Sequence, residues 1–413
     1  MQQVFGELGG AYDFAMPPLI RFGAGRLAEI GDVVRLWGRE AWIVAGGRSF
    51  TASGARERIE ASLAAAGIPG RVVASSAGEP TVDHVTAALA GLAGTGRDGV
   101  VVIAVGGGST IDLAKALAAM AVAVPPGRND LAALDTLVVD HLEGVGRGLS
   151  LRDWPLPVVA VPTTAGTGAE ATRNAVLSCP RRGFKKSMRS PMLVPRAALI
   201  DPQLTASCSR DTLLASGLDC ITQLIESYVC RFQRPLPRAL VLEALPRALD
   251  ALPRLLDQDA GPGGCSTDTR DADRAAMSHA ALISGVSLAN SGLGLAHGVA
   301  AALGVACGTS HGIACAVMLP AAMRLNRVAA RHDFAVLERA VDAAASPVDS
   351  AAADAFVSRI ERLCEAAPRR LSQIGVRAAQ LDWIASNSGG NSMRGNPVQV
   401  DEATLRSLLE EML

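Results

Sequence analysis

The sequence predicts an α/β domain with a parallel sheet over residues 1–203, followed by an all-helical domain over residues 204–413. In the first half, short apolar runs alternate with segments of helical period, as in sheets that carry helices on both faces. After Asp201 the strand patterns stop and long helical patterns follow one another. A chain of 413 residues is long enough to form two separate cores.

The predicted strands are apolar on both faces, which is typical of parallel strands covered by helices. They end in turn residues and span 41–47 (AWIVAGG), 71–78 (RVVASSAG), 99–108 (GVVVIAVGGG) and 156–168 (LPVVAVPTTAGTG). Between the first two, residues 55–67 (ARERIEASLAAAG) have a helical period and end at Gly67, a natural C-cap. Residues 124–155 have weak periodicity, so we expect a long connection with some short helix.

The second half consists of long helical patterns, and no clear strand interrupts them. The predicted helices span 210–232, 235–256, 270–290, 312–330 and 401–413. In the last, Leu405, Leu408, Leu409 and Met412 form one apolar stripe, and Asp401 is the expected N-cap. Residues 258–271 are glycine-rich and polar and predict a surface loop.

Composition excludes several functions. The net charge of −1 and an aromatic content of 3% argue against a nucleic-acid partner. The sequence has no long uninterrupted apolar stretch, so no membrane association is expected. The N-terminus, MQQVFGELGGAYDF, lacks the features of a signal peptide, and the eight cysteines form no CxxC pair. We therefore expect a cytoplasmic protein with reduced thiols, and its apolar helices indicate a homodimer or larger homo-oligomer.

Two loops have the character of phosphate-binding turns. In VVIAVGGGSTIDLAKALAAM, a strand leads through three glycines into a helix, whose first N–H groups favour a pyrophosphate. The second loop, VPTTAGTGAEAT (161–172), also follows a strand and offers the hydroxyls of Thr163, Thr164 and Thr167. A single glycine-rich turn is often only a tight connection. Two such loops at strand ends predict a dinucleotide across one edge of the sheet.

The loop after the first predicted strand bears on the choice of dinucleotide. Its residues are Gly46, Gly47, Arg48 and Ser49, with no carboxylate to bind a ribose 2′-hydroxyl. The Arg48 guanidinium suits a 2′-phosphate instead, so we predict NADP(H) in preference to NAD(H). The alternative is that Arg48 is a solvated surface charge.

A carboxylate and two histidines predict a metal site. His297 and His311 are 14 positions apart in two successive helical patterns, and Asp219 lies in a third. Two imidazoles and a carboxylate suit a divalent first-row metal with open positions. One helical turn after Asp219 stands Gln223, where a further histidine would complete the site. A lone histidine in an apolar stretch is more often a core residue, and we interpret His279 in that way.

Several motifs together resemble the iron-containing (group III) alcohol dehydrogenase family, which includes lactaldehyde reductases and propanediol dehydrogenases. They run nearly end to end: GGGSTIDLAKA, PTTAGTGAEAT, DPQLT, GLDCITQLIESYV, GLGLAHG and SHGIACAVMLP. The resemblance implies a Rossmann-like, dinucleotide-binding α/β domain, an all-α domain, and an active site in the cleft, an architecture shared with dehydroquinate synthase.

The resemblance also assigns residues. It implies metal ligands at Asp219, Gln223, His297 and His311. It places the cofactor against Gly106, Gly107, Gly108, Ser109, Asp112, Thr163, Thr164, Thr167, Lys185 and Leu204.

Two positions depart from the family pattern. The family usually has histidine where this chain has Gln223, and a second family histidine, suspected of relaying protons, is Ala301 here. Some relatives, such as maleylacetate reductases, work without a metal. Because a glutamine carbonyl oxygen can still coordinate a cation, we predict that Fe(II) or Zn(II) is retained but held more weakly.

These observations predict reversible hydride transfer between a nicotinamide cofactor and a small aldehyde or primary alcohol. One alternative is a metal-independent reductase similar to maleylacetate reductase. A second is a dehydroquinate-synthase-like lyase, although the apolar metal helices are short of the basic residues such a substrate needs. A third is a non-catalytic binding protein. Arg173, Lys185, Lys186 and Arg189 either suit an anionic aldehyde or form a solvated basic face.

Overall fold

The computed structural model describes residues 11–76, 78–125, 127–257 and 267–413, so most of the predicted loop at 258–271 lies outside the described residues. The chain divides into two compact units, Ala15–Ser209 and Arg210–Leu413, and residues 11–14 belong with the second. The division falls after Ser209 rather than after residue 203. The reason is a 3-10 turn, η4 (Pro202–Ser207), whose Leu204 is buried in the core of the first unit.

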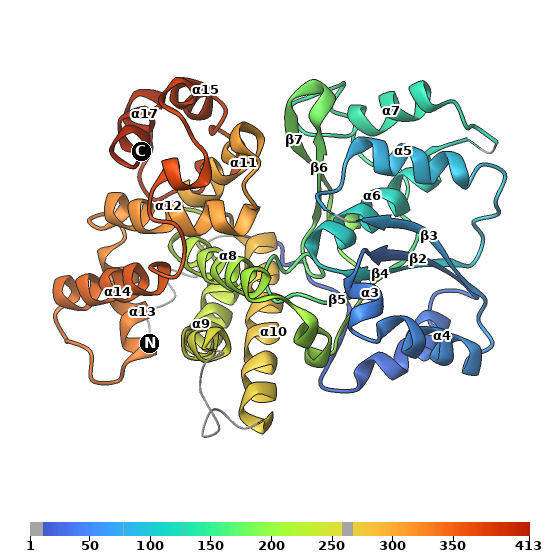
Figure 1. Ribbon diagram of the computed structural model, residues 1–413, viewed down its shortest axis with the longest axis horizontal. Helices are drawn as coiled ribbons and strands as arrows, with labels where there is room; N and C mark the ends of the chain where they lie inside the picture. The colour runs from blue at the N-terminus through green and yellow to red at the C-terminus, as the bar shows by residue number, and fades with distance from the viewer. Residues whose placement is uncertain (1–10, 77, 126, 258–266) are drawn as a thin grey trace. The chain divides into compact units, whose positions relative to one another are not determined.

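The first unit contains the predicted parallel sheet, with six strands in the order β1-β8-β5-β4-β2-β3 (Figure 1). The strands are β1 (Leu19–Phe22), β2 (Glu40–Gly46), β3 (Gly70–Ser76), β4 (Val100–Gly106), β5 (Val158–Pro162) and β8 (Ala197–Ile200). All neighbouring pairs are parallel. The chain runs outward from β2 to β3 and then returns to β4 on the other side of β2. In open α/β sheets, ligands bind at such a reversal of strand order, at the carboxyl ends of the strands.

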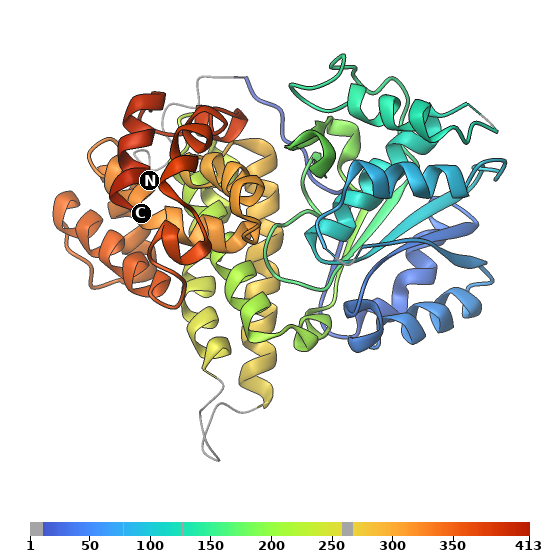
Figure 2. The same cartoon turned by 45° about the horizontal axis from the view of Figure 1, so that its top comes forward.

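Helices cover both faces of this sheet, as Figures 1 and 2 show. They are η1 (Arg26–Glu29), α2 (Ile30–Arg35), α3 (Ser49–Ala52), α4 (Ala55–Ala65), α5 (Val82–Gly91) and α6 (Gly108–Ala123). Helix α7 (Leu131–Asp140) packs on α5. Alternate side chains of β2 enter different cores. Trp42 and Val44 pack with α5 and α6, whereas Ala41 and Ile43 pack with α2 and α4. Both faces are therefore buried, which explains why the strands read as continuous apolar runs.

An antiparallel pair, β6 (Asn174–Cys179) and β7 (Phe184–Arg189), was not predicted from the sequence. It is joined by a 3-10 turn, η2 (Pro180–Arg182), and by Gly183, whose φ of +64° is left-handed. The side chains of β6 alternate between half-buried and buried, a pattern typical of a strand with one covered face. Such a strand mixes polar and apolar residues, so it lacks the apolar run by which the other strands were identified.

The second unit is all-helical over its described residues, as predicted. Its main helices are α8 (Arg210–Val229), α9 (Pro235–Leu256), α10 (Thr267–Asn290), α11 (Leu295–Cys307), α12 (His311–Asn326), α13 (Arg331–Val341), α14 (Asp349–Cys364), α15 (Leu381–Ser386), α16 (Asn391–Arg394) and α17 (Glu402–Glu411). Asp401 caps α17 as expected, since its carboxylate accepts a hydrogen bond from the Thr404 N–H at 2.7 Å. Of the helices described, none is by itself both long and apolar enough to cross a membrane; α10 and α11 pass that test only as a pair bent by 99°.

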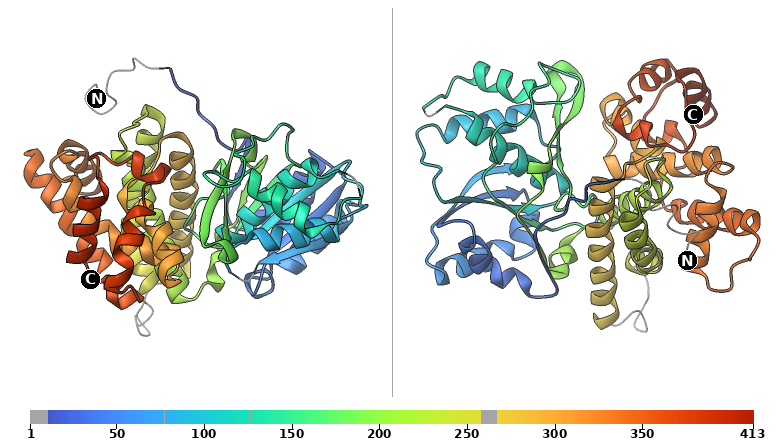
Figure 3. Two further views of the ribbon diagram at one scale, coloured as in Figure 1. Left: turned by 90° about the horizontal axis from the view of Figure 1, so that it is seen from above. Right: turned by 180° about the vertical axis from the view of Figure 1, so that it is seen from behind.

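Helix α8 is the centre of this unit. Every residue from Gly217 to Val229 is buried, and the helix packs against α9, α10 and α12. Figure 3 shows α9 and α10 side by side in both views. A Cβ atom on Gly217 would lie 2.4 Å from Leu252 of α9, so glycine allows the close approach of these two helices.

Candidate functional site

Three helices of the second unit bring the predicted carboxylate and imidazoles together. Asp219 lies in the middle of α8, His297 in the first turn of α11, and His311 at the start of α12. The Asp219 Oδ1 atom lies 3.2 Å from His297 Nε2 and 3.8 Å from His311 Nε2. The two imidazole rings meet edge to face with centroids 5.3 Å apart. His297 lies 78 positions after Asp219 in the chain, and His311 lies still further on, yet their side chains meet at one point.

Cys315 belongs to the same cluster, although it was not predicted from the sequence. Its Sγ atom lies 3.8 Å from His311 Nε2, and the four donor atoms of Asp219, His297, His311 and Cys315 all lie within 4.8 Å of one another. The spacing could have indicated it, because His311 and Cys315 are four apart on one helix and so lie on one face.

The separations of Asp219 Oδ1 from the two imidazoles fit a bound metal ion, and all four donor atoms lie within 4.8 Å of one another. Ligand bonds of about 2.0–2.3 Å in a tetrahedral arrangement separate neighbouring donors by about 3.3–3.6 Å. The observed separations of 3.2 and 3.8 Å from Asp219 Oδ1 to the two imidazoles lie within a few tenths of an ångström of that range. The side chains of Asp219 and His297 are 3% and 4% exposed, whereas that of His311 is 32% exposed. The side of the cluster next to His311 is therefore the accessible one.

Glu226 holds His297 in place from the side opposite Asp219. One carboxylate oxygen of Glu226 lies 2.7 Å from His297 Nδ1, and the other accepts a hydrogen bond from the Ala296 N–H at 2.7 Å. Glu226 therefore also caps the N-terminus of α11, where a negative charge is favoured. A Cβ atom at Gly294 would lie 2.9 Å from the Glu226 carboxylate, so glycine keeps this approach open. Glu226 follows Asp219 by seven residues, two helical turns on the same face, a signal that the sequence analysis did not use.

The charges of the cluster stabilise one another. Burial disfavours ionisation of Asp219, but the hydrogen bond with His297 and the imidazole of His311 outweigh it, so the pKa of this carboxyl is lowered. Burial also disfavours the imidazolium of His297, yet the thiol of Cys315 and the carboxylates of Asp219 and Glu226 raise its pKa well above the usual value. Burial raises the pKa of the Cys315 thiol to about 12.

Gln223 lies one turn beyond Asp219 and is 3% exposed. Its side-chain nitrogen donates a hydrogen bond to the Ser284 hydroxyl at 3.2 Å. The Ser284 hydroxyl itself donates to the Ala281 carbonyl oxygen at 2.8 Å. Because that hydroxyl has a single hydrogen, it acts as the acceptor toward Gln223, and this orients the amide with its nitrogen toward α10. Coordination of a metal by Gln223 stays a prediction.

The backbones of α8 and α12 touch beside the cluster. A Cβ atom at Gly312 would lie only 2.1 Å from the carbonyl oxygen of Ala215, one turn before Asp219. Glycine directly after His311 therefore permits a separation that no other residue would allow.

In the first unit, the predicted glycine loops meet at the reversal of strand order. Gly46 ends β2 and Gly106 ends β4, and these strands are neighbours. A Cβ atom at Gly46 would lie 3.1 Å from the Gly106 Cα atom and 2.7 Å from the Ser49 hydroxyl. Helix α6 begins at Gly108, so its first N–H groups are at this edge.

The two loops also pack directly on each other. Thr163 N–H donates to the Gly106 carbonyl oxygen at 3.0 Å, which joins the ends of β4 and β5. A Cβ atom at Gly108 would lie 2.4 Å from the Thr167 hydroxyl, and one at Gly107 would lie 3.2 Å from the Thr164 hydroxyl. Packing against Thr167 thus favours glycine at position 108, while Gly107 leaves only a tight space beside Thr164.

The other predicted cofactor residues differ in their surroundings. Arg48 is exposed at the start of α3, and within the described part of the chain its guanidinium makes no salt bridge. Asp112 accepts a hydrogen bond from the Val176 N–H at 3.0 Å, and burial raises its pKa to about 6. Lys185 on β7 forms an ion pair with Glu79. Leu204 is fully buried in the core. Binding of the cofactor by these residues stays a prediction.

Lys115 on α6 fastens the second loop and was not singled out from the sequence. This fully buried ammonium group donates to the carbonyl oxygens of Ala169 and Thr172 at 3.0 and 2.9 Å, and to the Thr172 hydroxyl at 2.8 Å. It lies 3.8 Å from the Asp112 carboxylate. Burial lowers its pKa to about 8.

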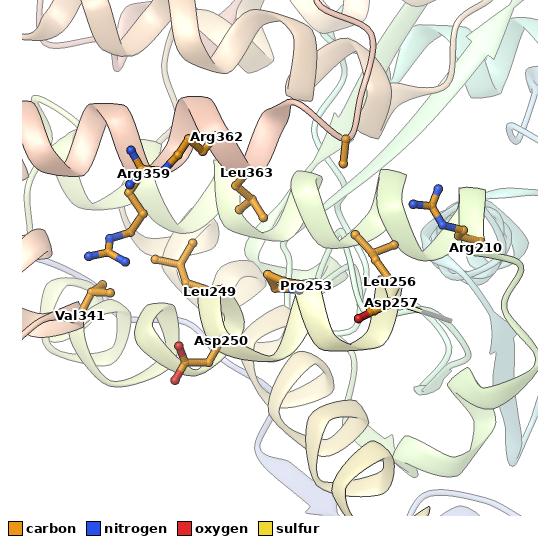
Figure 4. Close-up of a pocket in the computed structure, with 11 residues that line it drawn as sticks. Arg210, Leu249, Asp250, Pro253, Leu256, Asp257, Val341, Arg359, Arg362 and Leu363 are labelled. Carbon is orange, nitrogen blue, oxygen red and sulfur yellow. The ribbon is translucent and has the colours of Figure 1, made fainter. Parts of the chain in front are cut away.

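A separate surface hollow of about 680 Å³ lies among α9, α13 and α14 (Figure 4). Arg359 on its wall is paired with Glu338 at 2.8 Å. Within the described residues, its lining includes neither the four donor residues Asp219, His297, His311 and Cys315 nor the glycine loops.

Comparison with known proteins agrees with this division of the chain. Residues 17–202 match the family "Iron-containing alcohol dehydrogenase", and residues 213–413 match "Fe-containing alcohol dehydrogenase family, C-terminal". The probable alcohol dehydrogenase EutG of Escherichia coli is 29% identical over 93% of this chain and 90% of its own length. The NAD-dependent methanol dehydrogenase of Bacillus methanolicus is 26% identical over 91% of this chain and 93% of its own.

The fold also matches that of solved alcohol dehydrogenases. An alcohol dehydrogenase from Oenococcus oeni superposes with a TM-score of 0.84 at 25% identity, and the match covers 98% of this chain and 100% of that one. With both halves matched and the donor cluster in the helical half, the chain belongs to the iron-containing alcohol dehydrogenase family.

Proposed function

We propose that this protein transfers a hydride reversibly between a nicotinamide cofactor and a small aldehyde or primary alcohol, with a divalent metal ion held by Asp219, His297 and His311. The observation that carries this proposal is the convergence of one carboxylate and two imidazoles from three helices, with donor separations of 3.2 and 3.8 Å. The named activities of its relatives, an NAD-dependent methanol dehydrogenase and a probable alcohol dehydrogenase, support the same substrate class.

A divalent ion in this place would supply a Lewis acid for the oxygen of the aldehyde or alcohol. The residues of the chain prepare the site for it. Asp219 contributes the negative charge, and Glu226 binds His297 through Nδ1, so that Nε2 faces the other donors. Low exposure of Asp219 and His297 keeps bulk water from competing, while the more exposed side at His311 admits a small ligand.

The glycine loops of the first unit would bind the dinucleotide through the backbone of Gly106, Gly107 and Gly108 and the start of α6. A nicotinamide ring bound there would supply or accept the hydride. Ala301 stands one turn after His297 and has no group that can carry a proton. We propose that the alcohol proton passes through water or through the ribose hydroxyls of the cofactor instead.

We also propose a preference for NADPH over NADH. Arg48 supports it, since its exposed guanidinium lies just after β2 and makes no salt bridge within the described residues. The test is to replace Arg48 by Ala and compare kcat/KM for the two cofactors. We expect the variant to lose efficiency with NADPH by about tenfold or more, as for loss of one charge-assisted contact, and to keep its efficiency with NADH. A wild-type enzyme that prefers NADH strongly would contradict the proposal.

The main experiment follows oxidation of NADPH and NADH over a panel of small neutral and anionic aldehydes, after chelation and after addition of Fe(II) or Zn(II). We expect turnover to disappear on chelation and to return with metal. Asp219→Asn and His311→Ala should lower kcat at least about 100-fold while cofactor affinity is unchanged. His279→Ala, a histidine on α10 that pairs with Glu243, is the matched control. Full turnover of the metal-free protein would instead indicate a metal-independent reductase.

A further inference from the structure

We propose that Cys315 supplies the fourth donor of the metal site, so that the ion is bound by one carboxylate, two imidazoles and one thiolate. A site of this composition prefers Zn(II) to Fe(II). The inference rests on the proposed metal-dependent function, and it concerns which residues of this chain hold the ion and which ion they select.

The position of the Cys315 thiol fits that of a metal ligand. Its Sγ atom lies 3.8 Å from His311 Nε2, and it belongs to the one set of four donor atoms that all lie within 4.8 Å of one another in the described part of the chain. Zinc ligand bonds of about 2.3 Å to sulfur and 2.0–2.1 Å to nitrogen place two tetrahedral donors about 3.6 Å apart. The observed separation requires a shift of only a few tenths of an ångström.

The surroundings of Cys315 differ from those of an ordinary core cysteine. Its side chain is fully buried, but it faces a carboxylate and two imidazoles. Cys364 on α14 is the contrasting case, since it is buried away from any such cluster. A buried thiol surrounded by three metal-binding side chains is placed where a ligand is needed, and burial excludes an exposed, reactive role.

Gln223 is less suited to the fourth position. Its amide nitrogen is directed to the Ser284 hydroxyl on α10. The amide is also neutral and a weaker donor than a thiolate. Cys315, on α12, therefore offers the fourth ligand that a histidine at position 223 of α8 would have provided.

The donor types decide the ion. Thiolate together with imidazole is the set that tetrahedral zinc sites use, and the general order of affinities places Zn(II) above Fe(II). When the ion binds, the S–H bond of Cys315 breaks, an S–metal bond forms, and the proton leaves to solvent. The ion thus gains a second anionic ligand beside Asp219.

The experiment loads the purified full-length protein with Co(II) as a spectroscopic probe of zinc sites. We expect a sulfur-to-cobalt charge-transfer band in the near ultraviolet together with strong visible bands of tetrahedral cobalt. Cys315→Ser should abolish the charge-transfer band, and the matched variant Cys364→Ser should retain it. Zinc affinity, measured by competition with a chromophoric chelator, should fall about 100-fold in Cys315→Ser and change little in Gln223→Ala.

The outcomes separate the two proposals. A wild-type protein that binds neither Co(II) nor Zn(II) would overturn the metal centre itself. Cobalt binding without a sulfur band, or equal zinc affinity in Cys315→Ser, would overturn the role of Cys315 and leave the metal centre standing. A loss of zinc affinity in Gln223→Ala but not in Cys315→Ser would also overturn the role of Cys315, and the metal centre would again stand. The wild-type spectrum needs no substitution, so poor folding of a variant cannot obscure the answer.

Discussion

Glu226 and His297 are bound to each other twice, once through the imidazole Nδ1 at 2.7 Å and once through the N-terminus of the helix that carries the histidine. The same carboxylate therefore fixes both the ring and the backbone that presents it. A carboxylate behind a metal-binding histidine also sets which ring nitrogen keeps its proton.

Replacing Glu226 by Gln should weaken metal binding by about 10–100-fold, because the amide keeps the shape but loses the negative charge that orients the imidazole. Chelator competition at fixed pH measures this effect. Glu243→Gln is a suitable control, since Glu243 pairs with His279 away from the cluster. Equal metal affinity in Glu226→Gln and the wild type would contradict the positioning role of Glu226.

Replacing Gly108 by Ala should separate the two glycine loops, because the added Cβ atom would lie 2.4 Å from the Thr167 hydroxyl. We expect the affinity for NADPH, measured by fluorescence titration, to fall at least about tenfold, which corresponds to about 1.4 kcal/mol. Gly91→Ala is the control, since nothing lies within 4 Å of its added atom.

The double variant Gly108→Ala/Thr167→Ala tests the cause of that loss. Thr167→Ala removes the hydroxyl and methyl groups that the new Cβ atom meets, so part of the lost affinity should return. If the losses of NADPH affinity in Gly108→Ala and Thr167→Ala simply add in the double variant, the contact between the two loops is not the cause.

Replacing Lys115 by Met should leave two buried carbonyl oxygens, those of Ala169 and Thr172, without their ammonium donor. We expect the free energy of unfolding to fall by about 2–4 kcal/mol and cofactor binding to weaken, because Lys115 fastens the second loop. Denaturant titration and fluorescence titration measure the two effects. Lys186→Met on the less buried part of β7 should change neither quantity. Unaltered stability in Lys115→Met would show that water replaces the donor.

Glu170 predicts a pH dependence of stability. Burial raises its pKa to about 7, so between about pH 4.5 and 7 the folded protein keeps a proton that the unfolded chain has released. Stability from this group is therefore present at low pH and is lost as the pH rises through that window. Glu170→Gln removes the titration, and relative to the wild type it should gain roughly 1–3 kcal/mol from pH 4.5 to 7.5. Parallel stability curves for the two proteins would contradict this assignment.

The sequence predicted the parts of the fold whose signal is local. Strands β2 and β4 are buried on both faces, so each appears as a continuous apolar run that ends in glycine. The hairpin of β6 and β7 has one covered face, and β1 and β8 have only four residues each, so none of these gave a run long enough to identify. Leu204 shows why the division of the chain was placed too early: its turn packs back into the first core.

The candidate site could be predicted as a set of residue types but not as a geometry. Asp219, His297 and His311 were found because few residues bind metals and because of the family resemblance. Cys315 and Glu226 were missed even though each repeats at helical spacing from a predicted ligand, because spacing alone does not show which face of a helix meets its neighbours. Similarly, the contact of Gly108 with Thr167 depends on two loops that only the sheet brings together.

The absence of a side chain at Gly312 has a consequence for the assembly of the site. Main chain of α12 rests against main chain of α8 at this point, and this rigid backbone contact sets the distance between Asp219 and His311. In a zinc finger the ion organises an unfolded peptide, whereas here Asp219 and His311 lie on two helices whose backbones pack directly against each other. Stripping the ion should therefore leave the helical unit folded, and reloading should require no refolding.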